Sequence, residues 1–300
     1  MLQQPQPSKP ARLTVAFPLY KGARWEETVV ENIRHLPDDV RIILSDEVSS
    51  DDTAEKIANR FVNDPRIEVR MRNGLRGWRA HCNALIDENN TEFFCLLPQD
   101  DLIEPDYFEK LVAALDANPD AGLAFPRLFV VAHSREPVPA PSTPFELGKG
   151  LPWIEAILLE RYWNLGIPFR GVIRSTVLRH IPSTPSDHFA DQLWVFSMAL
   201  SAFLLEVPEA IYTKRYHGKN THTQWQTPST EERKAQLIHQ IKDVSEDHDT
   251  AETILVYLEQ VYACLEKSVL ENHTSRCEKF CNYLRRLKPT WILGYLRSKF

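Results

Sequence analysis

A short apolar run that ends at two adjacent carboxylates constrains the fold of this chain most. Residues 93–97 read Phe-Phe-Cys-Leu-Leu, and Pro98 and Gln99 separate this run from Asp100 and Asp101. An apolar run of this length bounded by proline predicts a buried strand. Because an open α/β sheet binds ligands beyond the carboxyl ends of its strands, both aspartates are predicted to lie at a binding edge. The alternative is that they open a loop and cap the next helix, as Asp often does.

Apolar runs alternate with segments of helical spacing through the first half of the chain. The predicted strands are residues 13–17, 40–44, 67–70 and 93–97, followed later by 204–207 and 210–212, and the predicted helices include 25–35, 54–61, 78–88 and about 190–202. Strands that alternate with helices in this way predict a parallel, doubly wound sheet with right-handed crossovers. The predicted fold class is therefore α/β, with a mostly parallel sheet flanked by helices.

Polar residues follow the end of each of the first four predicted strands. They are Pro18 to Tyr20, then Asp46 with Glu47, then Asn73, and finally Asp100 with Asp101. Parallel strands bring these four turns to one edge of the sheet. Carboxylates crowded there repel each other unless a cation joins them, and oxygen ligands suit Mg²⁺ or Mn²⁺. Since such ions usually complete their shell with substrate phosphate oxygens, a nucleoside diphosphate is the predicted ligand.

Two stretches in the second half of the chain carry further candidates. Asp191 stands one turn into the start of an apolar helix, and Asp187 is placed to cap that helix. Further on, the chain reads Lys-Arg-Tyr-His at residues 214–217. His217 offers a neutral nitrogen ligand for a metal ion, and Arg215 offers a guanidinium for diphosphate oxygens.

These segments resemble the inverting family-two glycosyltransferases, which have a GT-A fold with a Rossmann-like sheet. The segments that carry the likeness, over roughly residues 12 to 126, are Phe17-Pro18-Leu19-Tyr20, Ser45 to Thr53, Asn73-Gly74 through Asn83, and Gln99-Asp100-Asp101 with Pro105-Asp106. The resemblance implies transfer of a sugar from a nucleotide-sugar donor, with a UDP-sugar as the first candidate. The implied acceptor is a hydroxyl of a glycan or of a lipid-linked acceptor, as in polysaccharide biosynthesis, and the anomeric carbon is inverted.

The resemblance also implies roles for individual residues. Asp101 and His217 are the implied ligands of Mn²⁺ or Mg²⁺, and Asp191 is the implied catalytic base, with Asp187 in reserve. The implied contacts to the donor nucleotide are Pro18, Tyr20, Asp46, Glu47, Asn73, Arg79, Asn83, Asp100 and Arg215. The chain departs from the family's commonest pattern at Glu47, at Pro98 and at Ala190, where acidic residues with other spacing or identity are usual.

Two other functions are alternatives to a glycosyltransferase. A sugar-nucleotide pyrophosphorylase has a related sheet, but it needs a Gly-rich phosphate loop after the first strand, and residues 18–24 contain one glycine. A non-catalytic nucleotide-binding or scaffold protein would keep the fold without the transfer activity. The departures at Glu47, Pro98 and Ala190 keep this second alternative open.

The domain organisation predicted from composition has three parts. Residues 1–11 are expected to be a disordered tail, residues 12–228 a GT-A glycosyltransferase domain, and residues 229–300 a helical extension. Within the domain, residues 12–126 form the nucleotide-sugar half and residues 127–228 the acceptor half.

Two segments of the acceptor half each have two interpretations. The Pro-rich segment between residues 131 and 150 is expected to be a lid over the substrates or a plain surface crossover. A helix is predicted at residues 152–164, where Trp153 and Trp163 either stack on a sugar or pack in the core.

Charge and composition bear on partners and location. With 35 Lys and Arg against 41 Asp and Glu, the net charge is −6 and argues against nucleic-acid binding. Five cysteines, an odd number, are typical of reduced intracellular thiols. Without a signal peptide or a membrane-spanning apolar stretch, the chain is predicted to be cytoplasmic.

Residues 284–300 carry five basic and no acidic side chains. This composition suits a peripheral contact on the cytoplasmic face of a membrane. The alternatives are packing on the domain or a homodimer interface.

Overall fold

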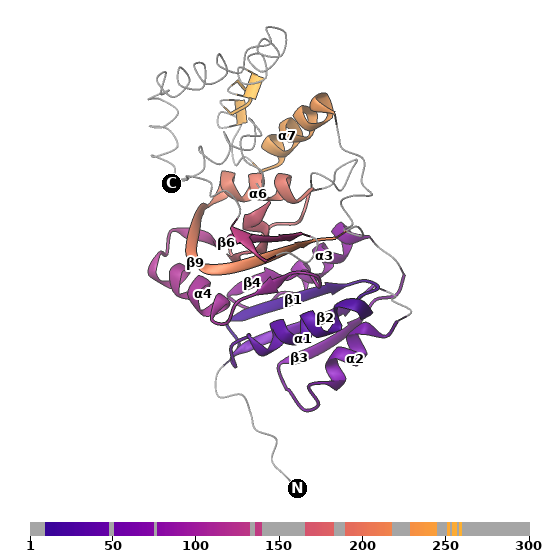
Figure 1. Cartoon of the computed structure of the whole chain (residues 1–300). Coiled ribbons are helices and arrows are strands. Elements are labelled where there is room, and N and C mark those ends of the chain that lie inside the picture. The colour runs from indigo at the N-terminus through magenta and orange to yellow at the C-terminus, as the bar shows by residue number, and fades with distance from the viewer. Residues whose placement is uncertain are drawn as a thin grey trace.

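The computed structural model describes residues 10–47, 51–74, 77–132, 136–139, 166–182, 190–217, 229–244, 251–252, 254–256 and 258–259. Within these ranges the chain forms one nine-stranded mixed sheet with flanking helices (Figure 1). The strands are β1 (Leu13–Leu19), β2 (Val40–Asp46), β3 (Ile67–Met71), β4 (Phe93–Leu96), β5 (Leu102–Ile103), β6 (Ala121–Ala132), β7 (Val138–Pro139), β8 (Val172–Arg174) and β9 (Phe203–Tyr216). The helices are η1 (Ala23–Trp25), α1 (Glu26–Arg34), α2 (Thr53–Asn59), α3 (Trp78–Asp87), α4 (Tyr107–Ala117), η2 (Ile167–Arg170), α6 (Ala190–Ser201) and α7 (Thr230–Val244), of which η1 and η2 are 3₁₀ helices.

The strand order confirms the predicted doubly wound first half. The sheet runs β3-β2-β1-β4-β8-β6-β9-β5, with β7 paired to β6, and β1 to β4 are mutually parallel where they pair. From β1 to β3 the chain moves one way along the sheet, and from β3 to β4 it moves back. Right-handed crossovers therefore place α1 and α2 on one face and α3 on the other (Figure 1).

The second half of the sheet is not parallel throughout. Strand β8 is antiparallel to both β4 and β6, whereas β6 and β9 are parallel. The two strands predicted at 204–207 and 210–212 are one long strand, β9, in which the pairing with β6 jumps from Val207 to Ile211. Pro208 lies in this irregularity, and proline has no N–H to donate to a ladder, so the strand bulges there and continues.

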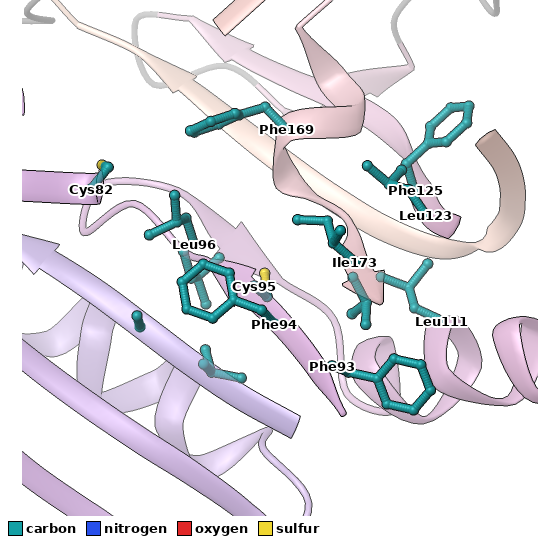
Figure 2. Packing of buried hydrophobic residues seen from close by; sticks show 14 of the residues in the cluster. Cys82, Phe93, Phe94, Cys95, Leu96, Leu111, Leu123, Phe125, Phe169 and Ile173 are labelled. Atoms are coloured by element: carbon teal, nitrogen blue, oxygen red, sulfur yellow. The ribbon is translucent and has the colours of Figure 1, made fainter. Parts of the chain in front are cut away.

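The core is continuous from β1 to the second half of the sheet. Every residue of β4 is buried, and Val15, Ala16 and Phe17 of β1 are fully buried as well. Both faces of these strands are covered, so they read as unbroken apolar runs. Figure 2 shows the side chains of β4 close to those of α4, β6, η2 and β8, with Phe93, Leu111, Leu123, Phe169 and Ile173 among those labelled.

One glycine fixes how closely η2 and β8 approach β6. A Cβ placed on Gly171 would lie 2.2 Å from the carbonyl oxygen of Ala124, so no larger residue fits without moving backbone. Gly171 joins η2 to β8, and this close approach therefore also fixes the position of Arg170, the last residue of η2.

The end of the sheet at which β1 to β4 begin, called the amino edge below, carries a set of paired charges. Arg12, just before β1, donates to Glu92 at 2.8 Å and to both carboxylate oxygens of Asp116 at 2.9 and 2.8 Å. Arg174, at the end of β8, lies 3.6 Å from Glu92. Both guanidinium groups stack over the ring of Phe93, at 5.1 and 5.3 Å from its centroid. The charges at this edge neutralise one another.

Helix α6 lies between the sheet and α7 (Figure 1). The side chains of Leu237 and Ile241 are buried on α7, which packs on α6. None of the helices that the structure describes is both long enough and apolar enough to span a bilayer.

Candidate active site

The carboxylate of Asp101 is buried and fully engaged by the protein. Its Oδ2 accepts a hydrogen bond of 2.6 Å from the Tyr212 hydroxyl, and its Oδ1 accepts one of 2.9 Å from the backbone N–H of Arg215. Asp101 is only 3% exposed, and burial raises the pKa of its carboxyl, with the neighbouring Asp100 adding to the rise. Asp101 therefore attaches the end of β9 to the loop that follows β4.

The backbone of the same loop is attached to α1. The side-chain amide of Asn32 donates to the carbonyl oxygen of Asp101 at 2.9 Å and accepts from the N–H of Ile103 at 3.1 Å. Arg215 also reaches α1, where its Nη1 donates to the Thr28 hydroxyl at 2.8 Å. Three elements, α1, β5 and β9, thus fix the position of the two aspartates.

Asp100, unlike Asp101, faces His217. Its Oδ2 lies 3.0 Å from Nε2 of His217, and the two side chains are 23% and 21% exposed. The ring of Trp25 packs against the imidazole with centroids 4.8 Å apart. The pair is thus held in place yet open to solvent.

The family resemblance implies Asp101 and His217 as metal ligands, and their metal ligation stays a prediction. In the structure His217 lies beside Asp100. Within the described residues, no three His, Cys, Asp or Glu side chains come together as a complete metal site. The 3.0 Å separation of Asp100 and His217 is that of a hydrogen bond. A carboxylate oxygen and an imidazole nitrogen are both groups that bind divalent cations, so the chemistry of this pair fits two ligands of a metal ion.

The acidic residues that follow β2 are enclosed by the protein. Asp46 is fully buried, and its Oδ2 accepts from the N–H of Ala54 at 3.4 Å. Glu47 is 3% exposed, and its Oε2 lies 3.8 Å from Nδ1 of His81. His81 in turn hydrogen-bonds the Ser45 hydroxyl through Nε2 at 2.8 Å. These side chains are buried beneath the surface where β2 ends. The contact of Asp46 and Glu47 with a nucleotide stays a prediction.

Arg79 and Asn83 of α3 hold another segment of the chain. The amide of Asn83 donates to the carbonyl oxygen of Ile181 at 3.0 Å and accepts from its N–H at 2.7 Å. Arg79 donates to the carbonyl oxygen of Pro182 at 3.1 Å. Both residues were predicted to contact the donor, and in this structure they attach the stretch before α6 to the first half of the sheet. Asn73, by contrast, is exposed in the turn after β3.

Pro18 and Tyr20 stand where β1 ends. Pro18 lies in β1 beside Ser45 of β2 and is partly buried. The backbone of Tyr20 is bonded to the side chain of Gln99, while its own side chain is 40% exposed. The turn after β1 therefore meets the acidic loop after β4, as the parallel topology predicts.

Asp191 lies in the first turn of α6 and is partly exposed. Its Oδ1 accepts from the N–H of Gln192 at 2.8 Å. A Cβ on Gly166 would lie 2.7 Å from Oδ2, so the glycine makes the room in which this carboxylate sits. Asp187, the residue held in reserve, lies outside the described residues, as do Trp153, Trp163 and the segment 284–300.

Sequence reasoning missed Arg170, the last residue of η2. Burial lowers the pKa of Arg170, but the negative charges of Asp101, Asp191 and Asp100, together with Tyr212, raise it overall. Its Nη1 is buried and has no hydrogen-bond partner in the described part of the chain. The available signal was one arginine inside the apolar stretch 167–173.

Comparison with known proteins defines the class of this molecule. The fold is the GT-A fold of nucleotide-sugar glycosyltransferases. Residues 14–172 match the sequence family described as Glycosyl transferase family 2, and the chain belongs to that family. No curated protein sequence matches the chain.

Solved structures support the fold at low sequence identity. S. aureus TarS (residues 1–349) in complex with UDP-GlcNAc is 16% identical, with a TM-score of 0.63 over 84% of this chain and 72% of that chain. The mannosyltransferase PcManGT from Pyrobaculum calidifontis, in complex with GDP-Man and Mn²⁺, is 16% identical, with a TM-score of 0.51 over 96% of this chain and 85% of that one. At such identities the likeness shows the fold alone.

Proposed function

We propose that the protein is a metal-dependent, inverting glycosyltransferase that moves a sugar from a nucleotide donor to an acceptor hydroxyl. The observation that carries the proposal is the approach of His217 to Asp100, at 3.0 Å, beyond the carboxyl end of β4. UDP-sugars are the first donor candidates and GDP-sugars the second, because TarS and PcManGT were solved with donors of these two kinds. The proposed acceptor is a glycan or a lipid-linked glycan.

Asp100 and His217 are the proposed metal ligands. A divalent cation held there, Mn²⁺ or Mg²⁺, would neutralise the negative charge that develops on the departing diphosphate. For Asp101 we propose a supporting role in place of the metal ligation that the family resemblance implies. With its two oxygens bonded to Tyr212 and Arg215, it fixes the end of β9 and so keeps His217 beside Asp100.

Asp191 is the proposed base. Its carboxylate takes the proton of the acceptor hydroxyl while the acceptor oxygen forms its bond to the anomeric carbon. The bond from that carbon to the diphosphate breaks at the same time, and the nucleoside diphosphate leaves with the electron pair, so the configuration inverts. The partly exposed position of Asp191 leaves room for an acceptor. The positive charge of Arg170 offsets the repulsion between these carboxylates.

The test is release of nucleoside diphosphate from UDP-GlcNAc, UDP-glucose and GDP-mannose, with Mn²⁺ and then with EDTA, in the presence of candidate glycan acceptors. We expect turnover with one donor, its loss in EDTA, and its loss in Asp191→Asn. Nucleotide binding without turnover under every combination would favour the non-catalytic alternative. Turnover that persists in EDTA would remove the metal from the proposal.

A further inference from the structure

We propose that Gln99 is a positioning residue whose side-chain amide holds Tyr20, which the family resemblance already places at the donor nucleotide, in the position that binds the donor. This inference rests on the proposed function, because it concerns the same donor site. It concerns a residue to which neither the sequence resemblance nor the proposed mechanism gives a role.

The geometry is a two-point attachment between the turn after β1 and the loop after β4. The Nε2 of Gln99 donates to the carbonyl oxygen of Tyr20 at 3.0 Å, and its Oε1 accepts from the Tyr20 N–H at 3.2 Å. The backbone N–H and C=O of one residue are thereby both satisfied by one side chain. Two bonds to a single residue fix direction as well as distance, as in a strand pair.

Gly22 makes this attachment sterically possible. A Cβ on Gly22 would lie 2.5 Å from Oε1 of Gln99 and 3.0 Å from a methyl carbon of Thr53. The φ of Gly22 is −93°, which any residue adopts, so its value here is the space it leaves and not its flexibility. An alanine at this position would push the amide of Gln99 away from Tyr20.

The rest of the turn is held in one conformation as well. Lys21 has a φ of 46°, a left-handed conformation that is unfavourable for a residue with a side chain. The N–H of Ala23 donates to Asp51 Oδ2 at 3.0 Å, and the N–H of Trp25 donates to the Gly22 carbonyl oxygen at 2.7 Å. The neighbouring contacts therefore impose a strained turn, which is typical of a functional site.

The attachment decides how Tyr20 can meet a ligand. Its N–H and C=O are already bonded to Gln99, so they do not read the edge of a base. Its ring is 40% exposed, with the ammonium of Lys21 at 5.1 Å from the ring centroid. A flat base stacks on such a ring whatever its identity, because every base has a π face. Tyr20 thus supplies affinity, and discrimination between uracil and guanine lies with other residues.

The test is titration calorimetry of UDP and of GDP, each with Mn²⁺, against four full-length proteins. These are the unaltered protein, Gln99→Met, Gly22→Ala and the double variant. Methionine keeps the length of glutamine and removes both hydrogen bonds. We expect each single variant to weaken UDP binding about tenfold, since two partly exposed hydrogen bonds orient Tyr20. The double variant should be no weaker than the weaker single variant, because both changes break the same attachment.

Enzyme kinetics separate positioning from general damage. In Gln99→Met the KM for the donor should rise about tenfold while kcat at saturating donor stays unchanged. The matched control is Asn118→Leu, which removes an exposed amide-to-backbone bond of 2.8 Å at the opposite edge of the sheet and should change neither constant.

The outcomes distinguish this inference from the proposed function. If the unaltered protein binds neither UDP nor GDP in the presence of Mn²⁺, the proposed function fails and this inference fails with it. If it binds one of them and Gln99→Met binds equally well, only the role of Gln99 is overturned. Additive losses in the double variant would likewise show that Gly22 and Gln99 do not act through one attachment.

Discussion

Charged side chains gather both at the amino edge of the sheet, where β1 to β4 begin, and at its carboxyl edge, where they end. The two sets are arranged differently. At the amino edge, Arg12 and Arg174 meet Glu92 and Asp116 in direct ion pairs. At the carboxyl edge, Asp100 lies beside His217 and Asp101 is hydrogen-bonded to Tyr212. The negative charges of Asp101, Asp191 and Asp100 raise the pKa of Arg170 there. Ion pairs at the first edge hold strands and helix together, whereas the crowded acids at the second edge cost stability unless a cation joins them.

This difference indicates which substitutions should change activity and which should change only stability. Removing a charge from the amino edge takes a partner from another charge and touches no proposed substrate. At the carboxyl edge, a substitution reaches residues of the proposed chemistry, and its effect on stability depends on the hydrogen bonds that the side chain makes. The predictions below test this distinction.

The largest expected effect is that of Asp191→Asn. An amide cannot accept the acceptor's proton, so kcat should fall by roughly 10² to 10⁴. The Tm should be unchanged within about 1 °C, because an amide oxygen still accepts from the Gln192 N–H. Activity assays and thermal unfolding of the same preparations check both parts. Asp120→Asn, at an exposed turn, is the matched control and should lose nothing.

The second effect concerns metal and nucleotide. Asp100→Asn should weaken Mn²⁺-dependent UDP binding about 100-fold and leave the weak binding in EDTA unaltered. Glu92→Gln, the corresponding change at the amino edge, should leave UDP binding unaltered and lower the Tm slightly. Calorimetry with and without Mn²⁺ measures the difference. Equal binding losses in the two variants would contradict the contrast between the edges.

The third effect is on stability and separates Asp101 from Asp100. Asp101→Ala should lower the free energy of unfolding by about 2 to 3 kcal/mol, because it leaves the buried Tyr212 hydroxyl without its partner. Asp101→Asn should lose less, since an amide oxygen accepts from the Arg215 N–H and the amide nitrogen donates to the Tyr212 oxygen. Urea unfolding of both variants provides the measurement. A loss as large in Asp100→Asn as in Asp101→Ala would refute the assignment.

The smallest effect is at the amino edge and depends on pH. The hydrogen bond from Arg12, together with its charge, holds the pKa of Asp116 below its ordinary value of 3.8. A depressed acid pKa adds stability above the unfolded value, and that stability is lost as the pH falls through the folded value. Asp116→Asn should therefore lower the Tm at pH 7 by no more than about 2 °C. The deficit should vanish as the pH falls well below 4. Thermal unfolding at low salt across this range tests the sign.

The first half of the fold was predictable because its determinants are local. Each of the first four strands is an apolar run that stops at a turn, and the structure extends β1 and β2 by two residues at their carboxyl ends. The second half depends on pairing between distant segments. Nothing local in residues 203–216 says that they form one strand bulged at Pro208, since its partner β6 lies some eighty residues earlier.

The acids that follow β4 stand out in the sequence, but the contacts that each of them makes do not. Two adjacent aspartates cannot be told apart in a sequence, and only the fold gives Asp101 to Tyr212 and leaves Asp100 to His217. Arg170 was missed because one arginine in an apolar stretch has no spacing to reveal it. Gln99 was overlooked because its role depends on the space beside Gly22, which no sequence pattern encodes.

The attachment of Asp101 to β9 has a consequence for how the protein is made. Asp101 is bonded to Tyr212 and Arg215, which are 111 and 114 positions further along the chain. Contacts of such separation form late in folding, because a long loop must close first. On the ribosome, β1 to β4 can pair before β9 has been synthesised, yet His217 has then not reached Asp100. A chain that ends before residue 217 therefore lacks the bonds between Asp101 and β9 or the contact of His217 with Asp100, so the proposed metal site is incomplete.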